Sequence, residues 1–317
     1  MDSAREADHF VTLFDSKFLP MGICLYESLL RYAQPFHLWI ICIDELVEHQ
    51  LGSIGLRHVT LIPLREVETE ALLAVKQERS RAEYCWTLTP FAPQFVFDRS
   101  EAVSRVTYLD ADLFFFDDPK ILLGELDECG KSVLITDHAY APEYDQSGLY
   151  GRFCVQFMTF CRTPGGLRVL HWWQDKCIEW CYARVEEGRF GDQKYLDVWP
   201  DIFSDDVHVL QRVEQTLAPW NVRYLGKCHG ELAPVFFHFH SLRIVDSREM
   251  ILYRGYNIGS SGESFYDQYV DALLDCFERL KLLGIVIPVI PNNESIPQIR
   301  RLKRWITRTG RYYRICA

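Results

Sequence analysis

The chain has 317 residues, of which 48% are hydrophobic and 25% charged, and this balance is typical of a globular protein with a sizeable core. Its formal net charge of −10 argues against general nucleic-acid binding, which needs a basic face. The 11 cysteines are odd in number and irregularly spaced. Residues 1–8 are too polar for a signal peptide, and no run approaches the ~18 apolar residues of a membrane span, so we expect reduced thiols in a cytoplasmic protein.

The first part of the chain alternates expected strands and helices. Residues 9–14, 38–43 and 59–62 are short apolar runs typical of buried strands, and the helical stretches 21–32 and 45–51 lie between them. This order predicts an α/β class with parallel strands and helices on both faces. The glycine-rich turn of dinucleotide binders and the Gly-Lys-Ser/Thr of phosphate loops are absent, so the phosphates of a bound nucleotide would need another anchor.

A pair of acids follows the fourth expected strand, at residues 106–109. Because residues two apart in extended backbone share a face, Asp110 and Asp112 should project together, with Ala111 between them. They also lie at the carboxyl end of the strand, where open α/β sheets place their ligands. Neighbouring carboxylates raise each other's pKa unless a cation is present, so the pattern predicts a divalent-cation site. A solvated turn is the alternative.

Later segments complete the expected sheet and its helices. Asp192 and Gln193 should begin a short helix after the motif Gly188–Gly191, which we expect to end the preceding helix. A strand at 235–241 would place His238 and His240 on one face, and the loop 139–151 is expected near the site. Further strands are expected at 133–136 and 153–160, helical spacing at 66–84, 90–98, 167–187 and 264–283, and a turn at 217–224.

The end of the chain has a different composition from the rest. From Ser295 onward no acid occurs among the cations, which alternate with apolar residues: Arg300, Arg301, Lys303, Arg304, Arg308, Arg311 and Arg314. A basic amphipathic helix of this kind suits an anionic membrane surface, and equally a dock on this acidic protein or on a partner. We therefore expect a main domain at 1–283 and a basic tail at 284–317, with the protein on the inner face of the membrane if the tail binds lipid.

Three motifs together resemble those of GT-A-type glycosyltransferases, in particular family 8-like retaining enzymes and related bacterial polysaccharide glycosyltransferases. They are Tyr108-Leu-Asp-Ala-Asp-Leu, Gly191-Asp-Gln-Lys-Tyr-Leu and Phe237-His-Phe-His-Ser, and the resemblance spans roughly residues 9–242. It implies a GT-A-type, Rossmann-like mixed sheet flanked by helices, with a C-terminal helical extension. It also implies a nucleotide-sugar donor, with UDP favoured, and a metal that is usually manganese.

The same resemblance implies roles for the motif residues. Asp110 and Asp112 would bind Mn²⁺, or alternatively Mg²⁺, with His240 as the first choice for the third ligand and His238 as the second. Asp192 would accept hydrogen bonds from hydroxyls of the donor sugar, with a helix N-cap as its alternative. Gln193 would lie under the anomeric carbon.

Other candidate contacts follow from the resemblance, each with a structural alternative. The end of the first strand would hold the base and ribose through Phe14, Asp15 and Ser16. Arg81 and Trp86 would contact phosphate and sugar, or be a surface charge and a core aromatic. Cys154, where relatives often carry Asn, and Gln156 would face the sugar, and Trp220 and Asn221 would line an acceptor platform or pack. The signature His-x-x-Gly-x-x-Lys-Pro-Trp is absent, so no lysine is identified for the diphosphate.

The resulting prediction is a metal-dependent, retaining glycosyltransferase that adds a hexose-type sugar to a glycan, such as a lipid-linked bacterial surface polysaccharide. A catalytically silent scaffold recruited to a membrane is one alternative. An Asp-x-Asp phosphohydrolase is another, although that class carries the pair on its first strand and follows it with a hydroxyl residue. A sugar-phosphate nucleotidyltransferase would need a glycine-rich N-terminal loop, which this chain lacks.

Overall fold

A computed structural model describes residues 7–246, 249–288 and 309–315. Its main sheet has seven strands in the order β3-β2-β1-β4-β7-β6-β8. β7 is antiparallel to both β4 and β6, whereas the other neighbours are parallel. The expected α/β class with a mixed sheet is therefore confirmed. The strands are β1 (Asp8–Phe14), β2 (Phe36–Cys42), β3 (Val59–Pro63), β4 (Arg105–Leu109), β6 (Val133–Asp137), β7 (Phe153–Cys161) and β8 (Val207–Val209).

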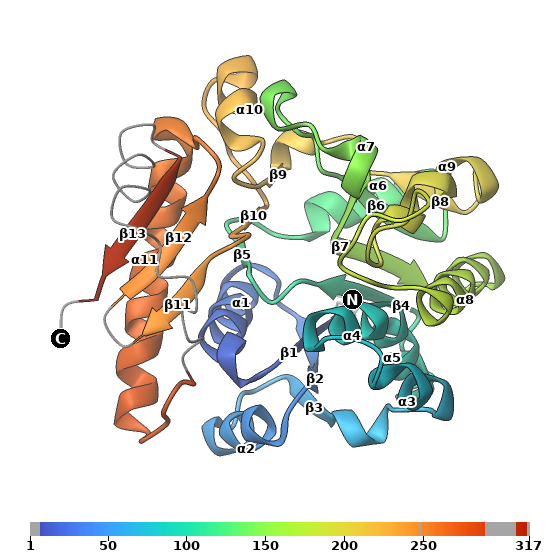
Figure 1. The fold of residues 1–317 in the computed structure, drawn as a ribbon, viewed down its shortest axis with the longest axis horizontal. Coiled ribbons are helices and arrows are strands. Elements are labelled where there is room, and N and C mark those ends of the chain that lie inside the picture. The colour runs from blue at the N-terminus through green and yellow to red at the C-terminus, as the bar shows by residue number, and fades with distance from the viewer. Residues whose placement is uncertain (1–6, 247–248, 289–308, 316–317) are drawn as a thin grey trace, which may run out of the picture.

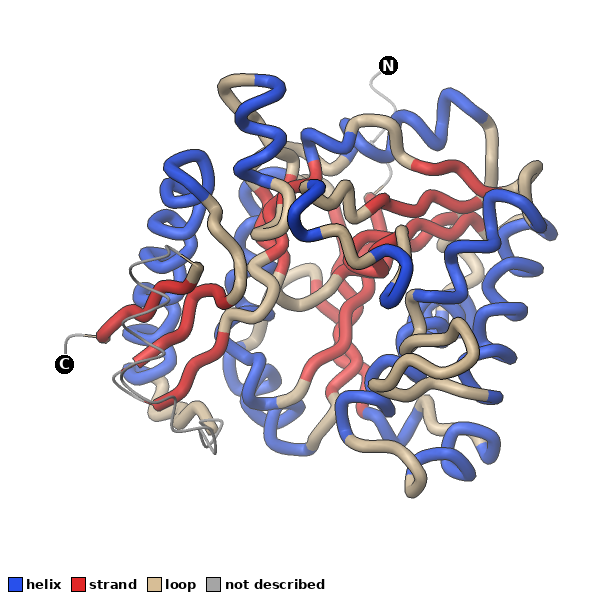
Figure 2. The backbone as a smooth tube through the Cα atoms, turned by 45° about the horizontal axis from the view of Figure 1, so that its top comes forward, coloured by secondary structure: helices blue, strands red, loops and turns tan. Residues whose placement is uncertain are grey.

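Each face of this sheet carries its own hydrophobic core, because successive side chains of a strand point to opposite faces. Within β1, Phe10 belongs to one core, and Val11 and Leu13 belong to the other. Figure 2 shows the strands between layers of helices. The first core takes α1 (Leu19–Tyr32), α2 (Glu45–Ile54), α6 (Lys120–Cys129) and α11 (Gly259–Leu282). The second takes α3 (Glu70–Lys76), α4 (Arg81–Leu88), α5 (Ala92–Arg99), α8 (Pro164–Glu179) and α9 (Trp199–Ile202).

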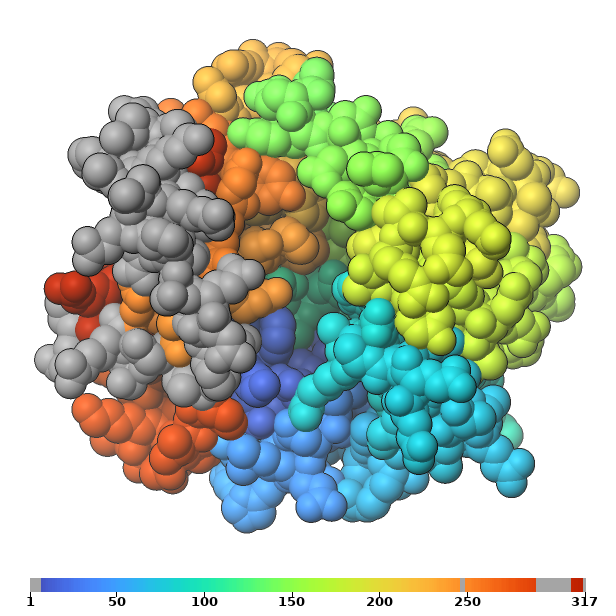
Figure 3. Space-filling view, in the orientation of Figure 1, coloured from blue at the N-terminus to red at the C-terminus, as the bar shows by residue number. Residues whose placement is uncertain are grey.

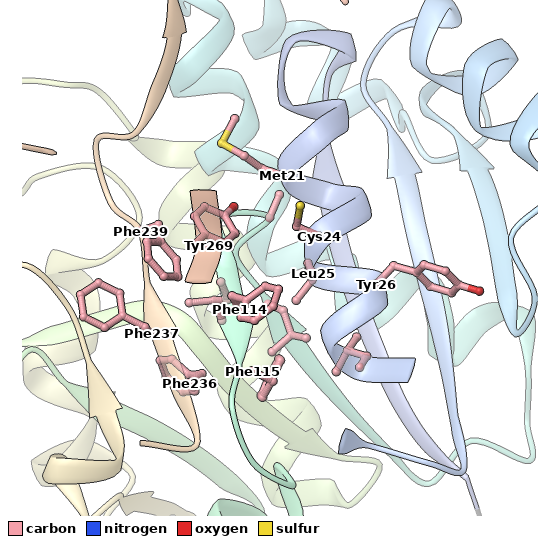
Figure 4. Close-up of a cluster of buried hydrophobic side chains, with 14 of the residues drawn as sticks. Met21, Cys24, Leu25, Tyr26, Phe114, Phe115, Phe236, Phe237, Phe239 and Tyr269 are labelled. Atoms are coloured by element: carbon pink, nitrogen blue, oxygen red, sulfur yellow. The ribbon is translucent and has the colours of Figure 1, made fainter. Parts of the chain in front are cut away.

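Two three-stranded sheets extend the fold beside α1 and α11 (Figure 1). An aromatic cluster joins the first of them to these helices, as Figure 4 shows, and Phe239 stacks on Tyr269 of α11 with ring centroids 3.8 Å apart. The two sheets consist of β5 (Leu113–Phe115), β10 (Phe236–His238) and β9 (Thr216–Leu217), and of β11 (Arg243–Asp246), β12 (Glu249–Arg254) and β13 (Gly310–Arg314). Two further helices are α7 (Ser147–Tyr150) and α10 (Val222–His229).

Helix boundaries differ from the expectation at two places. The segment 66–84 is broken in two, because Ser80 and Glu83 form a reciprocal capping box that starts α4. The helix expected at 167–187 ends at Glu179, since Trp180 is extended (φ −157°, ψ 126°). The motif Gly188–Gly191 therefore does not cap it, and instead begins inside a short turn between the paired residues Glu186 and Arg189.

The expected basic helix is wrong for the described part of the tail. Residues 310–314 form the edge strand β13, antiparallel to β12, and Arg311 makes an ion pair of 2.9 Å with Asp267 of α11. The alternating sequence Arg-Tyr-Tyr-Arg suits a strand with two different faces. The remaining tail cations up to Arg308 lie outside the described residues.

The described ranges contain ten cysteines, and all of them are free thiols. None of the helices in these ranges combines the length and apolar character that crossing a bilayer requires.

Candidate active site

Two acids and one histidine meet at the carboxyl end of β4. The acids lie in the turn between β4 and β5, and the strand pairing of β5 with β10 sets Leu113 opposite His238. The Nε2 atom of His238 lies 3.1 Å from Asp112 and 3.7 Å from Asp110. The ligand atoms of all three residues lie within 4.8 Å of one another. Two carboxylates and one imidazole are a donor set that suits Mn²⁺ and also accepts Mg²⁺.

Of the two histidines, His238 and not His240 joins the acids, which corrects the order of preference drawn from the sequence. β10 ends at His238, and the chain turns at Ser241, whose φ is +68°. The strand alternation that placed both histidines on one face therefore stops too early. His240 is exposed, and its ring lies 5.5 Å from that of His238 but outside the three-residue group.

The three residues are electrostatically coupled. Burial raises the pKa of Asp110 to about 7, an effect that His238 opposes and Asp112 reinforces. Burial would also raise the pKa of Asp112, but the charge and hydrogen bond of His238 hold it at about 2. In turn, Asp112 raises the pKa of His238 well above its ordinary value despite burial. Without a cation the site therefore contains a His238–Asp112 ion pair, and a metal ion would take the place of the imidazole proton.

Three residues that were expected to contact sugar instead support His238 from behind. The Nδ1 atom of His238 lies 2.6 Å from the amide oxygen of Gln156, which is 1% exposed. Cys154, two residues earlier on β7, hydrogen-bonds to the same imidazole, and the ring of Trp220 packs edge-on against it at 5.5 Å. Cys154 and Gln156, which were expected to face the sugar, thus direct these polar contacts at His238. A hydrogen bond from Nδ1–H to Gln156 would leave the Nε2 lone pair directed at the acids.

Residues around His138 complete this support. The only indication of His138 in the sequence was its place at the end of an expected strand. His138 hydrogen-bonds to Cys154, and this contact helps to lower the pKa of the thiol to about 6 against the effect of burial. The indole of Trp220 donates to the His138 carbonyl at 2.7 Å. The amide of Asn221 binds the carbonyls of His138 and Thr216 and the backbone N–H of Ala218. Asn221 is thus a buried turn residue and Trp220 is packed, which corrects the expected acceptor platform.

Asp192 lies within electrostatic reach of Asp110 and is 5% exposed. Burial raises its pKa to about 8, and Asp110 adds to the effect. The following short helix (Lys194–Val198) has Gln193 at its N-cap position without a side-chain cap, so Asp192 does not cap it. The side chain of Thr89, which sequence reasoning missed, is within hydrogen-bonding reach of both Asp192 and Tyr108, and the Tyr108 hydroxyl donates to Asp110 at 3.0 Å. The result is a polar chain between the two acids.

The ends of β1 and β2 form a second polar group at the same edge of the sheet. Arg81 bridges Asp15 (2.9 Å) and Asp44 (2.6 Å), and the Ser16 hydroxyl donates to Asp44 at 3.0 Å. Asp44 is an addition to the residues expected from the sequence. Phe14 is a correction, because its ring is buried against α1 at Gly22, where even a Cβ atom would overlap it. Arg81 is exposed and Asp15 is partly exposed, whereas Ser16 is buried beside them and directs its hydroxyl at Asp44.

A cation near the acids comes from Arg243, at the start of β11. Its guanidinium packs over the ring of Phe18 and donates to the Leu242 carbonyl, and in the described part of the chain it makes no ion pair within 4 Å. Its charge contributes to the low pKa of Asp112, and burial lowers its own pKa. The sequence signal was weak, because Arg243 follows the histidine strand without the glycine and lysine of the family signature. A partly buried cation of this kind suits an anionic ligand.

One face of the molecule has a hollow. Figure 3 shows it near the centre, between the cyan segment around residue 80, the yellow-green segment around 185 and the orange C-terminal segment. Trp86 of α4 is half-buried and packs on Gly191, the residue that precedes Asp192. The candidate site therefore combines two acids and a histidine, the buried Asp192, a cation and an aromatic ring.

No protein-family model matches the chain. Two Bacillus subtilis proteins, both uncharacterized, are similar along most of its length. YfnD is 30% identical over 263 residues, which are 79% of this chain and 83% of YfnD. YfnF is 30% identical over 258 residues, which are 76% of this chain and 84% of YfnF.

Solved structures with a similar fold are glycosyltransferases. The galactosyltransferase LgtC, in complex with donor and acceptor sugar analogs, matches 84% of this chain and 95% of its own with a TM-score of 0.51 at 12% identity. The apo form of GlyE from Streptococcus pneumoniae matches 86% of this chain with a TM-score of 0.51 at 14% identity, and this chain covers 64% of it. WbbM, a bifunctional enzyme, matches 88% of this chain at 13% identity with a TM-score of 0.51, and 53% of it is covered. At these identities the likeness establishes the fold, which is GT-A.

Proposed function

We propose that this chain, which belongs to the same family as YfnD and YfnF and has the GT-A fold, is a metal-dependent glycosyltransferase. It would move a sugar from a nucleotide-diphosphate donor, with UDP favoured, to a glycan acceptor. The observation that carries the proposal is the group Asp110, Asp112 and His238 at the carboxyl end of β4, of which Asp112 and His238 are buried. Open α/β sheets bind ligands at such strand ends.

The donor set fits a divalent cation, and these three residues would hold it. A cation there supplies charge stabilisation for the diphosphate leaving group, which becomes more negative as the sugar–phosphate bond breaks. Gln156 keeps the imidazole of His238 oriented. Arg243 would bind diphosphate oxygens whose negative charge the cation does not neutralise. Arg243 would thereby serve the role for which no lysine was found.

Recognition of the donor would involve both polar groups of the site. Asp15, Ser16 and Asp44 at the ends of β1 and β2 offer carboxylate and hydroxyl partners for ribose and base. Asp192, protonated in the ligand-free chain, can donate as well as accept a hydrogen bond with a sugar hydroxyl.

Retention at the anomeric carbon is the proposed stereochemistry. The Gln193 amide nitrogen donates to the Tyr150 carbonyl at 2.8 Å, and its amide oxygen has no hydrogen-bond partner among the described residues. A neutral oxygen under the anomeric carbon would steady an oxocarbenium-like centre without trapping it as strongly as a carboxylate.

The proposed acceptor is a growing bacterial surface polysaccharide, which is often lipid-linked, and the proposed location is the inner membrane face. The tail carries cations that could bind an anionic membrane surface, although Arg311 is paired with Asp267.

A variant of the tail tests membrane attachment. Replacing Arg300, Arg301, Lys303 and Arg304 by Ser keeps β13, whereas deletion of the whole tail would remove this strand. Loss of co-sedimentation with phosphatidylglycerol vesicles would support membrane attachment, and unchanged co-sedimentation would favour docking on protein.

Calorimetry with UDP, GDP, CDP and dTDP, each with Mn²⁺ and with EDTA, tests the proposal. We expect one nucleotide to bind with Mn²⁺ and not with EDTA, and Asp110→Ala to remove this binding while the exposed Asp205→Ala keeps it. Absence of binding by all four, on folded protein, would contradict the transferase and favour the silent scaffold. Release of inorganic phosphate from a sugar phosphate would favour the phosphohydrolase instead.

A further inference from the structure

We propose that Trp86, Phe190 and Tyr150 form a stacking platform for a sugar ring of the acceptor, an inference that rests on the proposed glycosyltransferase function. The three rings come from α4, from the segment after α8 and from α7. The centroid of Phe190 lies 4.6 Å from that of Tyr150 and 5.9 Å from that of Trp86. Three aromatic residues far apart in the sequence thus converge at one place.

The platform is fixed relative to the candidate catalytic residues. Gly191 has a φ of +52°, and a Cβ atom there would lie 3.3 Å from the indole of Trp86, so the ring rests on backbone that leads directly into Asp192. On the other side, Gln193 holds the segment of Tyr150 through the hydrogen bond to its carbonyl. The Glu83 carboxylate of α4 also accepts from the Ala183 backbone at 2.7 Å, which ties α4 to the segment that carries Phe190.

The exposure of these rings separates them from core aromatics. Trp173 and Trp199 are fully buried, whereas Trp86, Phe190 and Tyr150 all keep part of their surface in solvent. A pyranose ring has a face of C–H groups, which suits the negative face of an aromatic ring, and hydroxyls at its rim that remain free for hydrogen bonds. Half-buried rings beside buried acids therefore form the mixed apolar and polar surface that a sugar requires.

Position favours the acceptor over the donor. The donor sugar has to reach the partly buried Asp110 and the buried Asp192, whereas the platform consists of half-buried rings, one of which packs on Gly191. Figure 3 shows the cyan, yellow-green and green segments that carry the three rings around the hollow, at its opening to solvent. An acceptor entering from solvent would meet these rings before it meets the donor sugar.

Saturation-transfer NMR and calorimetry on the full chain test this platform. Wild type saturated with Mn²⁺ and the nucleotide that binds it would be titrated with methyl glycosides of glucose, galactose, mannose and N-acetylglucosamine. We expect saturation of the ring C–H protons of at least one glycoside. Phe190→Ala and Trp86→Ala should raise its Kd roughly tenfold, and Phe190→Tyr should restore it. Trp172→Ala, at another half-buried tryptophan that packs on two rings, is the matched control and should change nothing.

Nucleotide binding separates the possible failures. Unchanged glycoside affinity in both alanine variants, or no glycoside binding to the loaded wild type, would overturn the platform. An equal loss of nucleotide affinity in the variants would overturn it too, since the rings would then serve the donor. If the wild type binds none of the nucleotides, the proposed function fails, whereas glycoside binding that depends on Phe190 would still support the platform.

Discussion

Replacing Asp192 by Asn should stabilise the metal-free protein while impairing its activity. The pKa of Asp192 lies near 8 instead of 3.8, because the side chain is buried and faces Asp110. Between these two pH values the folded state keeps the proton that the unfolded state loses. The contribution of this group to stability is therefore complete in acid and is lost as the pH rises through the folded pKa. An amide resembles the protonated acid and cannot ionise, so the variant escapes that loss.

The size of the effect follows from the shift. A difference of about four pKa units corresponds to at most roughly 6 kcal/mol between pH 4 and pH 8, since one unit is about 1.4 kcal/mol. The protein relaxes around the ionised carboxylate and lowers the cost of its charge, so we expect Asp192→Asn to gain ~2–4 kcal/mol over wild type at pH 8 and almost nothing at pH 4. Above pH 8 the difference should stay constant.

Urea unfolding at pH 4 to 9 in EDTA measures this difference directly. The exposed Asp205→Asn is the control and should follow the wild-type curve. A gain that is the same at pH 5 and pH 8, or a variant less stable than wild type at pH 8, would refute a protonated Asp192. Donor turnover in Mn²⁺ should fall in the same variant, because an amide cannot accept hydrogen bonds at both of its terminal atoms.

Three other substitutions test separate parts of the structure. Asp110→Ala should abolish turnover and Mn²⁺ binding with an unchanged circular dichroism spectrum, and full activity would exclude the metal role. Gln156→Leu should weaken Mn²⁺ binding ~10–100-fold in calorimetry, because the imidazole loses its orienting partner, whereas equal affinity would make the amide a packing residue only. Gly22→Ala should cost ~1–3 kcal/mol in chemical denaturation, because its Cβ would overlap a buried ring. Gly52→Ala in α2, where a Cβ meets open space, is its control and should instead gain ~0.5–1 kcal/mol.

Sequence patterns predicted the position of a helix or strand best where its ends coincide with a change from apolar to polar residues. The first strand and helix were expected at 9–14 and 21–32 and lie at Asp8–Phe14 and Leu19–Tyr32, since an apolar run between polar residues has few alternative ends. The helix after residue 164 was extended too far, because its apolar spacing continues past Glu179 through residues that pack in extended backbone. Periodicity records which side chains share a face, and it is insensitive to where the backbone leaves the helix.

The same limit explains the errors at the site. The acids were expected to share a face of extended backbone, but they lie in a turn that the hydrogen bond from the Leu113 N–H to the Asp110 carbonyl closes. The motif resemblance indicated a C-terminal histidine as their partner. Which histidine lies beside the acids depends on the residue at which β10 ends, and the pairing of β10 with β5 determines that residue. Cys154 and Gln156 do share a face of β7, but that face supports His238 from within the protein. Whether a side chain contacts the ligand or a residue that binds the ligand depends on tertiary contacts, which strand periodicity does not contain.

The pairing of β5 with β10 has a consequence for the synthesis of this protein. The acids follow β4 near the first third of the chain, whereas their histidine partner is made more than a hundred residues later. A nascent chain that stops before residue 236 can form β1 to β4, yet it holds the acid pair without the imidazole. Closing so long a loop is entropically costly and slow. Tight metal binding would therefore be possible only after residue 238 has been synthesised and β10 has paired with β5. A ribosome-bound fragment without β10 would not bind the donor.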